Sequence, residues 1–267
     1  MENQNENKRS AKIIALLNCK GGVGKTTSSL DMGAAMAALG KKVLLVDIDS
    51  QCSLTLSVGI RNKPEFTTFD IMKQDFSKEV KILTCPQDPN GNLKIIPCDL
   101  MLGLADLTLT GAIQREVILK KFLNKLRPLF DYIIIDCPPA LGIVNMNTLF
   151  ASDILIVPII PEPLAVQGLR VLQAGIDYLN GFDIKKVKID GMLISRLDSR
   201  TALHKNLETR LRIEFGEKVF RTVIHENIDI AKASGCNQTI YQFNRNSIGA
   251  QDYLEFTQEF LQKYDNL

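Results

Sequence analysis

The chain has 267 residues, of which 45% are hydrophobic, and it carries 32 basic against 30 acidic residues. This length suits one large α/β domain with a sizeable buried core. The nearly balanced charge excludes a global field that would draw the whole molecule onto nucleic acid, so any such binding has to come from a local basic patch. No apolar run approaches the roughly 18 residues of a membrane span, and a soluble protein is expected.

Residues 1–10 are polar and lack the apolar core of a signal peptide. We therefore predict a disordered tail over residues 1–10 and a single folded domain over residues 11–267. The six cysteines form no C-x-x-C pair and show no metal-ligand spacing. Such cysteines are typical of reduced thiols in a cytoplasmic protein, and most are expected to be buried as small hydrophobic residues.

Apolar segments that predict strands alternate along the chain with amphipathic segments that predict helices. This alternation is typical of a doubly wound α/β fold, a mostly parallel sheet with helices on both faces. We predict strands over residues 13–17, 42–49, 93–98, 131–136, 154–159, 187–197 and 219–224. We predict helices over residues 28–39, 68–73, 114–126, 164–179, 202–215 and 247–263. Residues 50–92 are less regular, and we assign them no chemistry.

The sequence Asn-Cys-Lys-Gly-Gly-Val-Gly-Lys-Thr-Thr, residues 18–27, joins the first predicted strand to the first predicted helix. Glycines allow several backbone N–H groups to point at one anion, and a helix N-terminus adds partial positive charge, so this turn predicts a phosphate-binding loop. Lys25 would contact phosphate, and the Thr26 hydroxyl would bind Mg²⁺. The strict P-loop pattern fails at Cys19, where it requires glycine. A second lysine, Lys20, stands in the loop instead.

Carboxylates end two of the predicted strands. Asp47 and Asp49 end one, and Asp136 ends another. In open parallel sheets, ligands bind beyond the carboxyl ends of the strands, so these side chains are expected to lie near the phosphate loop. An aspartate that ends a strand beside such a loop typically holds the Mg²⁺ shell, and we predict this role for Asp136. Two prolines follow it and indicate an extended turn near the γ-phosphate.

Two further loops are expected to border a bound nucleotide. Pro161 lies in a proline-rich loop after the strand predicted over residues 154–159. The tetrad Ser-Arg-Leu-Asp at residues 195–198 is similar to the N-K-x-D base-binding motif of GTPases, with serine in place of asparagine. We interpret this tetrad, with Arg196, as the wall of a base pocket.

The sequence Lys-Gly-Gly-Val-Gly-Lys-Thr-Thr resembles the deviant Walker A motif of the ParA/MinD ATPases, and the resemblance is closest to ParA-type partition proteins. Residues 43–51 resemble the second ParA signature, in which proline usually stands at the position of Ser50, and residues 135–139 resemble the third. Weaker matches at residues 197–201 and 249–253 extend the resemblance over nearly the whole chain. The resemblance implies a P-loop NTPase fold with ATP and Mg²⁺ as cofactors.

The resemblance also implies a role for each motif residue. Lys25 and Thr26 hold phosphate and Mg²⁺, Asp136 completes the metal shell, and Asp49 positions the attacking water. Lys20 reaches across a nucleotide-sandwich dimer to the partner's phosphates, and it counts with Lys25 and Asp49 as catalytic. The residues implied to bind the nucleotide are Gly21, Gly22, Val23, Gly24, Lys25, Thr26, Thr27, Pro161 and Arg196.

By the same resemblance, the protein forms a homodimer with ATP, binds double-stranded DNA without sequence specificity, and contacts no membrane. A ParB-like adaptor stimulates hydrolysis, and the nucleoid-associated cycle segregates a plasmid or a chromosome. One departure is that Glu226 and Asp229 stand in a segment that is arginine-rich in many family members. We therefore predict DNA contacts among neighbouring basic residues. These are Arg196, Arg200, Lys218, Arg221, Lys232 and Arg245.

Three alternative functions are considered. A MinD-like membrane-positioning ATPase needs a C-terminal amphipathic helix with a basic face, whereas residues 252–267 carry four acidic residues against Lys263 alone. An iron-protein reductase needs two cysteines per subunit to share a cluster across a dimer, for which Cys98 and Cys137 are the candidate pair. A P-loop metabolic ligase of the dethiobiotin synthetase type is the third alternative.

Overall fold

The computed structural model describes residues 10–75, 77–88, 90–140, 142–182 and 184–265. A seven-stranded sheet lies at the centre, in the order β3-β4-β2-β5-β1-β6-β7. Neighbouring strands run parallel except β3, which pairs antiparallel with β4. The strands are β1 Lys12–Leu16, β2 Val43–Asp47, β3 Leu83–Thr84, β4 Leu93–Ile96, β5 Tyr132–Asp136, β6 Ile154–Ile159 and β7 Gly191–Ile194. The tail predicted over residues 1–10 lies, except for its last residue, outside the described residues.

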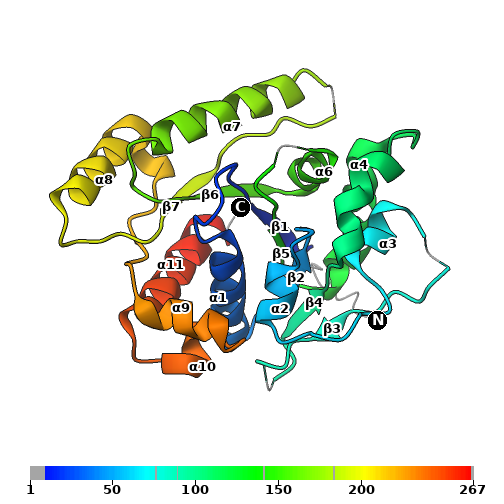
Figure 1. Cartoon of the computed structure of the whole chain (residues 1–267), viewed down its shortest axis with the longest axis horizontal. Helices are drawn as coiled ribbons and strands as arrows, with labels where there is room; N and C mark the ends of the chain where they lie inside the picture. The colour runs from blue at the N-terminus through cyan, green and yellow to red at the C-terminus, as the bar shows by residue number, and fades with distance from the viewer. Residues whose placement is uncertain (1–9, 76, 89, 141, 183, 266–267) are drawn as a thin grey trace, which may run out of the picture.

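Helices cover both faces of the sheet, which confirms the predicted doubly wound α/β class. α1 and α11 pack on one face, and α6 and α7 pack on the other (Figure 1). Successive strand residues such as Ile13 and Ile14 belong to the two different cores, because side chains along a strand alternate between faces. The helices are α1 Lys25–Ala38, α2 Ser53–Ser57, α3 Thr68–Met72, α4 Ala105–Thr108, α5 Ile118–Leu126, α6 Ile143–Ala151, α7 Ala165–Leu179, α8 Ala202–Phe215, α9 Ile228–Gly235, α10 Ile240–Asn244 and α11 Ile248–Tyr264, with 3₁₀ turns that include η1 Leu100–Leu104.

The strand predicted over residues 219–224 is wrong. This segment runs beside β7 and joins it through one isolated bridge, between Met192 and Val219. The N–H groups of Phe220 and Ile224 donate to carbonyls of β7 at 2.9 Å each, but no continuous ladder forms. The backbone N–H groups of Arg221 and Thr222 instead donate to the Glu259 carboxylate of α11, at 2.8 Å each. A side chain thus takes two of the donors in the middle of this segment, and the strand ladder is interrupted there.

The other predicted strands and helices are confirmed, with bounds that differ by a few residues. β7 is the largest exception, because it covers only the middle of the strand predicted over residues 187–197. The sequence did not predict α2, α4, α6, α9, α10 or the two-residue strand β3. α9 and α10 follow the segment 219–224 and lie beside α1 and α11 (Figure 1).

Two glycines allow close packing between layers. A Cβ atom on Gly33 of α1 would lie 2.9 Å from the Leu45 side chain, so only glycine lets this helix sit so near β2. A Cβ atom on Gly191 would lie 2.5 Å from the Phe220 ring. That ring instead fills the space and packs edge-to-face against Phe256 of α11, with centroids 4.9 Å apart.

Strand order and register place the predicted site residues at one edge of the sheet. From β1 the chain passes to β2 on one side, and it later returns through β5 to β6 on the other side. The carboxyl end of β1 is therefore the switch point at which ligands bind in such sheets. Asp136 at the end of β5 lies opposite both Leu16 of β1 and Asp47 of β2.

α1 also carries a buried carboxylate outside this edge. Asp31 is 3% exposed, and its Oδ1 accepts a hydrogen bond from the Ile240 N–H at the start of α10, at 2.9 Å. Burial raises the pKa of Asp31 to about 7, although the hydrogen bond from Ile240 lowers it in part. The neighbouring Tyr241 hydroxyl is buried without a hydrogen-bond partner among the described residues. Ionised Asp31 therefore destabilises the folded state.

We expect Asp31→Asn to reduce the pH dependence of stability. The folded state keeps the Asp31 proton up to about pH 7, whereas the unfolded chain releases it near pH 3.8, so the wild-type free energy of unfolding falls as pH rises between these values. Between pH 5 and pH 8, the free energy of unfolding of the variant relative to that of the wild type should rise by about 1–3 kcal/mol. Urea denaturation at both pH values measures it. An equal shift for Asp177→Asn, an exposed aspartate on α7, would contradict the assignment.

Candidate nucleotide-binding site

The loop between β1 and α1 has the backbone of an anion cradle. Gly22 and Gly24 have φ angles of 73° and 83°, which side chains with a Cβ rarely adopt. Gly24 is the N-cap of α1, and the first turn of this helix contains no acidic residue. The first N–H groups of α1 and its positive dipole end therefore remain available to an anion.

The two lysines of this loop point in different directions. Lys25 is 7% exposed, and its Nζ donates to the backbone carbonyls of Asn18 and Lys20, at 3.2 Å each. The Lys20 side chain is exposed, and its Nζ pairs with the carboxylate of Glu162, in the loop between β6 and α7. Lys25 is thus a buried positive charge inside the loop, whereas Lys20 faces outward.

Asp136 is a buried carboxylate with an unmatched oxygen. It is fully buried, its Oδ1 accepts a bond from the Ser29 hydroxyl at 3.3 Å, and its Oδ2 has no partner among the described residues. Burial, and next the negative charge of Asp47, raise the pKa of Asp136 to about 8, while the Thr26 hydroxyl and Lys25 act in the opposite direction. An orphaned oxygen beside a threonine hydroxyl fits Mg²⁺, so Thr26 and Asp136 could hold this ion together with phosphate oxygens.

The two aspartates that follow β2 have different surroundings. Asp47 is fully buried, and its Oδ2 accepts bonds from the Thr55 N–H at 2.8 Å and hydroxyl at 2.6 Å. Burial raises the pKa of Asp47 to about 6, and these bonds lower it in part. Asp47 is therefore used to hold α2. Asp49 lies at the wall of the cavity, where its Oδ1 accepts a bond from the Gln51 N–H at 2.9 Å.

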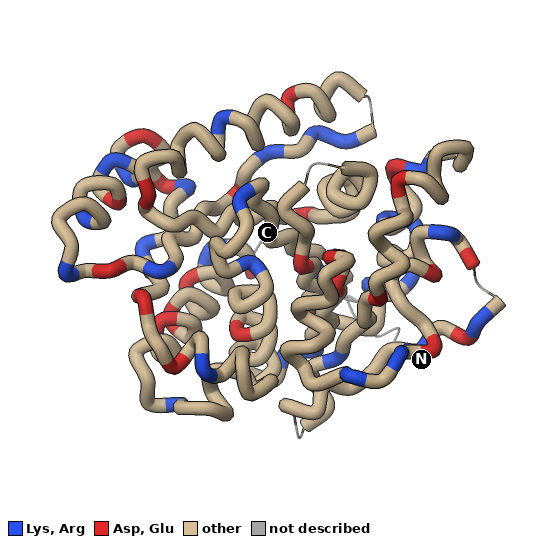
Figure 2. Tube along the Cα trace, viewed as in Figure 1, with Lys and Arg blue, Asp and Glu red and all other residues tan. Residues whose placement is uncertain are grey.

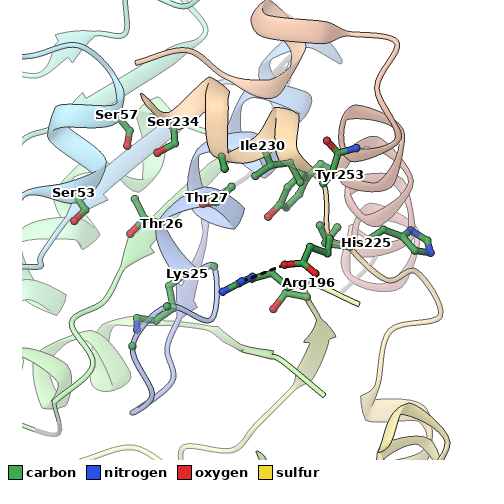
Figure 3. A pocket seen from close by; sticks show the side chains of 18 of the residues that line it. Lys25, Thr26, Thr27, Ser53, Ser57, Arg196, His225, Ile230, Ser234 and Tyr253 are labelled. Atoms are coloured by element: carbon green, nitrogen blue, oxygen red, sulfur yellow. Dashed lines mark hydrogen bonds and ion pairs between the residues drawn. The ribbon is translucent and has the colours of Figure 1, made fainter. Parts of the chain in front are cut away.

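A cavity of about 1190 Å³ lies above the phosphate loop (Figure 3). It brings together most of the residues that the sequence assigned to nucleotide or catalysis. These are Gly21, Gly22, Gly24, Lys25, Thr26, Thr27, Asp49 and Arg196. Of the residues predicted for nucleotide, metal or catalysis, four do not line it, namely Lys20, Val23, Asp136 and Pro161. Arg200, predicted to contact DNA, does line it.

Val23 contributes through its backbone, which ties the phosphate loop to the expected base pocket. The Ser195 hydroxyl at the end of β7 donates to the Val23 carbonyl at 2.8 Å. Arg196 follows in a left-handed conformation, with φ of 52°, and its guanidinium pairs with the Glu226 carboxylate at 3.4 Å (Figure 3). Ser195 and Arg196 of the tetrad therefore line the cavity, whereas Leu197 and Asp198 do not, and the base pocket stays a prediction.

The sequence analysis missed the wall formed by α2, α9 and α11. Ser57 of α2 and Ser234 of α9 line one end of the cavity, and Ile230 and Tyr253 lie between α9 and α11 (Figure 3). The spacing from Asp49 could have located α2, since the chain that leaves this strand end has to start at the site. The segment 225–230 was considered only for DNA, and it lines the cavity instead.

The six residues predicted to contact DNA differ in whether they form an ion pair. Arg196, Arg200 and Arg221 each pair with a carboxylate, those of Glu226, Asp198 and Glu259 respectively. The other three predicted residues are exposed and have no ion pair with another described residue. They are Lys218, Lys232 and Arg245. Figure 2 shows basic and acidic residues interspersed along the chain.

Two alternative functions meet structural objections. Cys98 and Cys137 are 2% and 1% exposed, so neither thiol could reach a cluster shared with another subunit. The large aromatic side chains of α11, among them Phe256 and Phe260, pack inward against the sheet and α1, which leaves no aromatic face for lipid. Within the described ranges, no helix combines the length and apolarity that a membrane crossing requires.

Comparison with known proteins connects this site to a family. The AAA domain family model (AAA_31) matches residues 11–209. Sporulation initiation inhibitor protein Soj of Bacillus subtilis is 38% identical over 249 residues, which cover 93% of this chain and 97% of that protein. Chromosome partitioning protein ParA of Caulobacter vibrioides is 30% identical over 256 residues, 94% of each chain.

A similar solved structure is that of cobyrinic acid a,c-diamide synthase from Mycobacterium smegmatis with bound ATP analog and magnesium. It is 29% identical, covers 96% of each chain and superposes with a TM-score of 0.81. The likeness confirms the predicted P-loop NTPase fold. Because the family model covers most of the chain and the two relatives match nearly all of it, this chain belongs to the AAA domain family of P-loop ATPases, among the Soj/ParA chromosome-partitioning proteins.

Proposed function

We propose that this protein is a ParA-type ATPase that binds ATP and Mg²⁺ in the cavity above the phosphate loop and uses their cycle to segregate a chromosome or a plasmid. With ATP it forms a homodimer that binds DNA without sequence specificity, and it works in the cytoplasm at the nucleoid. A ParB-like adaptor stimulates hydrolysis. The observation that carries this proposal is the divergence of the two lysines, since Lys25 lies inside the loop and Lys20 faces away from it.

Hydrolysis needs a positioned water and a place for developing negative charge. Asp49, fixed at the cavity wall by its bond to the Gln51 N–H, can orient the water for in-line attack. Lys25 and the N-terminus of α1 offset the charge on the phosphates. Thr26 and Asp136 hold Mg²⁺, which supplies further charge neutralisation when it is bound.

The choice of ATP and Mg²⁺ is supported by the M. smegmatis synthase structure, which contains an ATP analog and magnesium. We do not carry over amide synthesis from that protein, because the relatives with higher identity are partition proteins. The residues around the phosphate loop account for binding and hydrolysis of ATP without a second substrate.

Exposed apolar side chains beside the site support a homodimer. Gly103 of η1 packs close to Ser50, the residue after Asp49. Around it, large hydrophobic side chains of η1 and α4 are exposed, namely Leu100, Met101, Leu104 and Leu107. A second copy that faces the nucleotide would cover these side chains and receive Lys20, and both changes favour association.

For hydrolysis, we expect Asp49→Ala to keep ATP binding and to lower turnover about 100-fold or more, because the attacking water is no longer oriented. ATP affinity from calorimetry and phosphate release with and without adaptor measure the two effects. Asp177→Ala, which removes an exposed carboxylate on α7, serves as the control. Turnover of Asp49→Ala equal to that of the control would remove Asp49 from the mechanism.

Alanine substitutions at the two lysines should affect different quantities. Lys25→Ala removes a charge-assisted contact of roughly 1.5–3 kcal/mol and should weaken ATP binding in the monomer accordingly. Lys20→Ala should leave monomer affinity within a few-fold of wild type and abolish the ATP-dependent dimer and stimulated hydrolysis. Calorimetry and light scattering with a non-hydrolysed ATP analogue report both quantities. A Lys20→Ala protein that still dimerises would exclude the cross-dimer role.

DNA binding should require ATP and weaken steeply with salt, since the logarithm of affinity falls by about 0.9 per phosphate contact for each tenfold rise in salt. Alanine at the three basic residues without ion pairs, Lys218, Lys232 and Arg245, should flatten this slope. Alanine at Lys63, exposed on another part of the chain, is the control. Random duplex DNA is titrated at several salt concentrations with ATP and with ADP. Equal affinity with both nucleotides would refute the nucleotide dependence.

A further inference from the structure

Lys20 is held in place by an acid on a neighbouring segment. Its Nζ pairs with the Glu162 carboxylate, and both side chains are 42% exposed. Glu162 is itself fixed, because its N–H donates to the Ile160 carbonyl at 2.8 Å and its carbonyl accepts from the Ala165 N–H at 2.9 Å, at the start of α7. The carboxylate is therefore presented to Lys20 by an ordered turn.

The backbones behind this ion pair are joined as well. The Asn18 side chain is buried, its Nδ2 donates to the Pro158 carbonyl of β6 at 2.7 Å, and its Oδ1 accepts from the Lys20 N–H at 2.9 Å. The phosphate loop and the turn after β6 are thus connected at their base by Asn18 and at their tip by Lys20 and Glu162. Together these contacts define the direction in which Lys20 points in the single subunit.

We propose that Glu162 is a positioning residue that holds Lys20 in the monomer and has to release it before Lys20 can contact the phosphates of a partner subunit. This inference rests on the proposed cross-dimer role of Lys20. The Glu162 carboxylate of the same chain and a phosphate bound to the partner chain then compete for the Lys20 ammonium. A two-fold symmetric dimer has to release two such ion pairs. The small free energy of each Lys20–Glu162 pair therefore opposes dimerisation twice.

The exposure of the Lys20–Glu162 pair determines how strongly it should affect dimerisation. An exposed ion pair typically contributes little, so two of them should weaken the dimer by about 2- to 30-fold at low salt. Salt screens exposed charges, and the effect should shrink toward 0.5 M salt, where the Debye length is only about 4 Å. Glu162→Gln keeps the shape of the side chain and removes its charge. Glu162→Asp keeps the charge but shortens the reach.

The test measures the dimer dissociation constant by analytical ultracentrifugation, with Mg²⁺ and a non-hydrolysed ATP analogue, at low and high salt. Glu162→Gln should tighten the dimer by about 2- to 30-fold and Glu162→Asp by less, while monomer ATP affinity is unchanged. Glu65→Gln removes the same charge from the exposed Glu65–Lys81 pair and controls for net charge. A Glu162→Gln dimer as weak as wild type, weaker, or no tighter than the Glu65→Gln dimer would overturn the proposal.

Failure of this proposal can be told from failure of the proposed function. If Lys20→Ala still dimerises, the cross-dimer role itself is wrong, and Glu162 has nothing to restrain. If Lys20→Ala is monomeric but Glu162→Gln does not tighten the dimer, then only the restraint by Glu162 is wrong.

Discussion

The cost of burying charge at the carboxyl edge of the sheet is the constraint on which the site depends. Asp136 and Asp47 lie opposite each other at the ends of β5 and β2, both fully buried, and Lys25 is buried nearby. Burying an ionised carboxylate without a partner costs several kcal/mol of folding free energy. One oxygen of Asp136 has no hydrogen-bond partner among the described residues. Strands that are apolar on both faces exclude the water that would otherwise solvate it. A bound cation beside Asp136, together with an anion beside Lys25, would therefore offset the cost of burying these groups.

The phosphate loop is held by segments that are distant in the sequence. Ser195 after β7 binds the Val23 carbonyl, and Asn18 binds the Pro158 carbonyl of β6. These bonds tie the loop to β6, which lies next to β1 in the sheet, and to the residue after β7, so its backbone is restrained by more than its own strand and helix. A cradle restrained in this way loses little entropy when phosphate arrives. Val23, whose side chain is buried and which does not line the cavity, thus acts through its carbonyl alone.

The fold class and the phosphate loop could be predicted because their determinants are local. Fully buried strands appear as apolar runs, and the loop has its glycines, lysines and helix start within ten residues. The conformation of segment 219–224 could not be predicted, since the backbone N–H groups of Arg221 and Thr222 are taken by Glu259, which lies far along the chain in α11. Long-range partners of this kind leave no mark on local sequence.

α6 was missed for a different reason. Its buried face contains Asn145 and Asn147, which are 1% and 0% exposed and obscure the apolar period of the helix. Their amides donate to the carbonyls of Pro138 and Arg115, at 2.9 and 2.7 Å. Such polar residues can be buried only when their partners are in place, and those partners are known only from the structure. Likewise, the sequence placed Asp47 and Asp49 at the end of one strand but could not show that Asp47 holds α2 through Thr55.

The contacts of α11 bear on how a newly made chain matures. The Tyr253 hydroxyl of α11 lies 3.1 Å from the Ser28 hydroxyl of α1, and the Lys12 ammonium of β1 donates to the Tyr264 carbonyl, partners that are 225 and 252 residues apart in the chain. The phosphate loop thus leaves the ribosome long before the cavity wall at Tyr253 does. Contacts this distant form late, because a long loop has to close before they stabilise anything. A growing chain therefore cannot complete the wall of this cavity until α11 has been synthesised and has packed against α1.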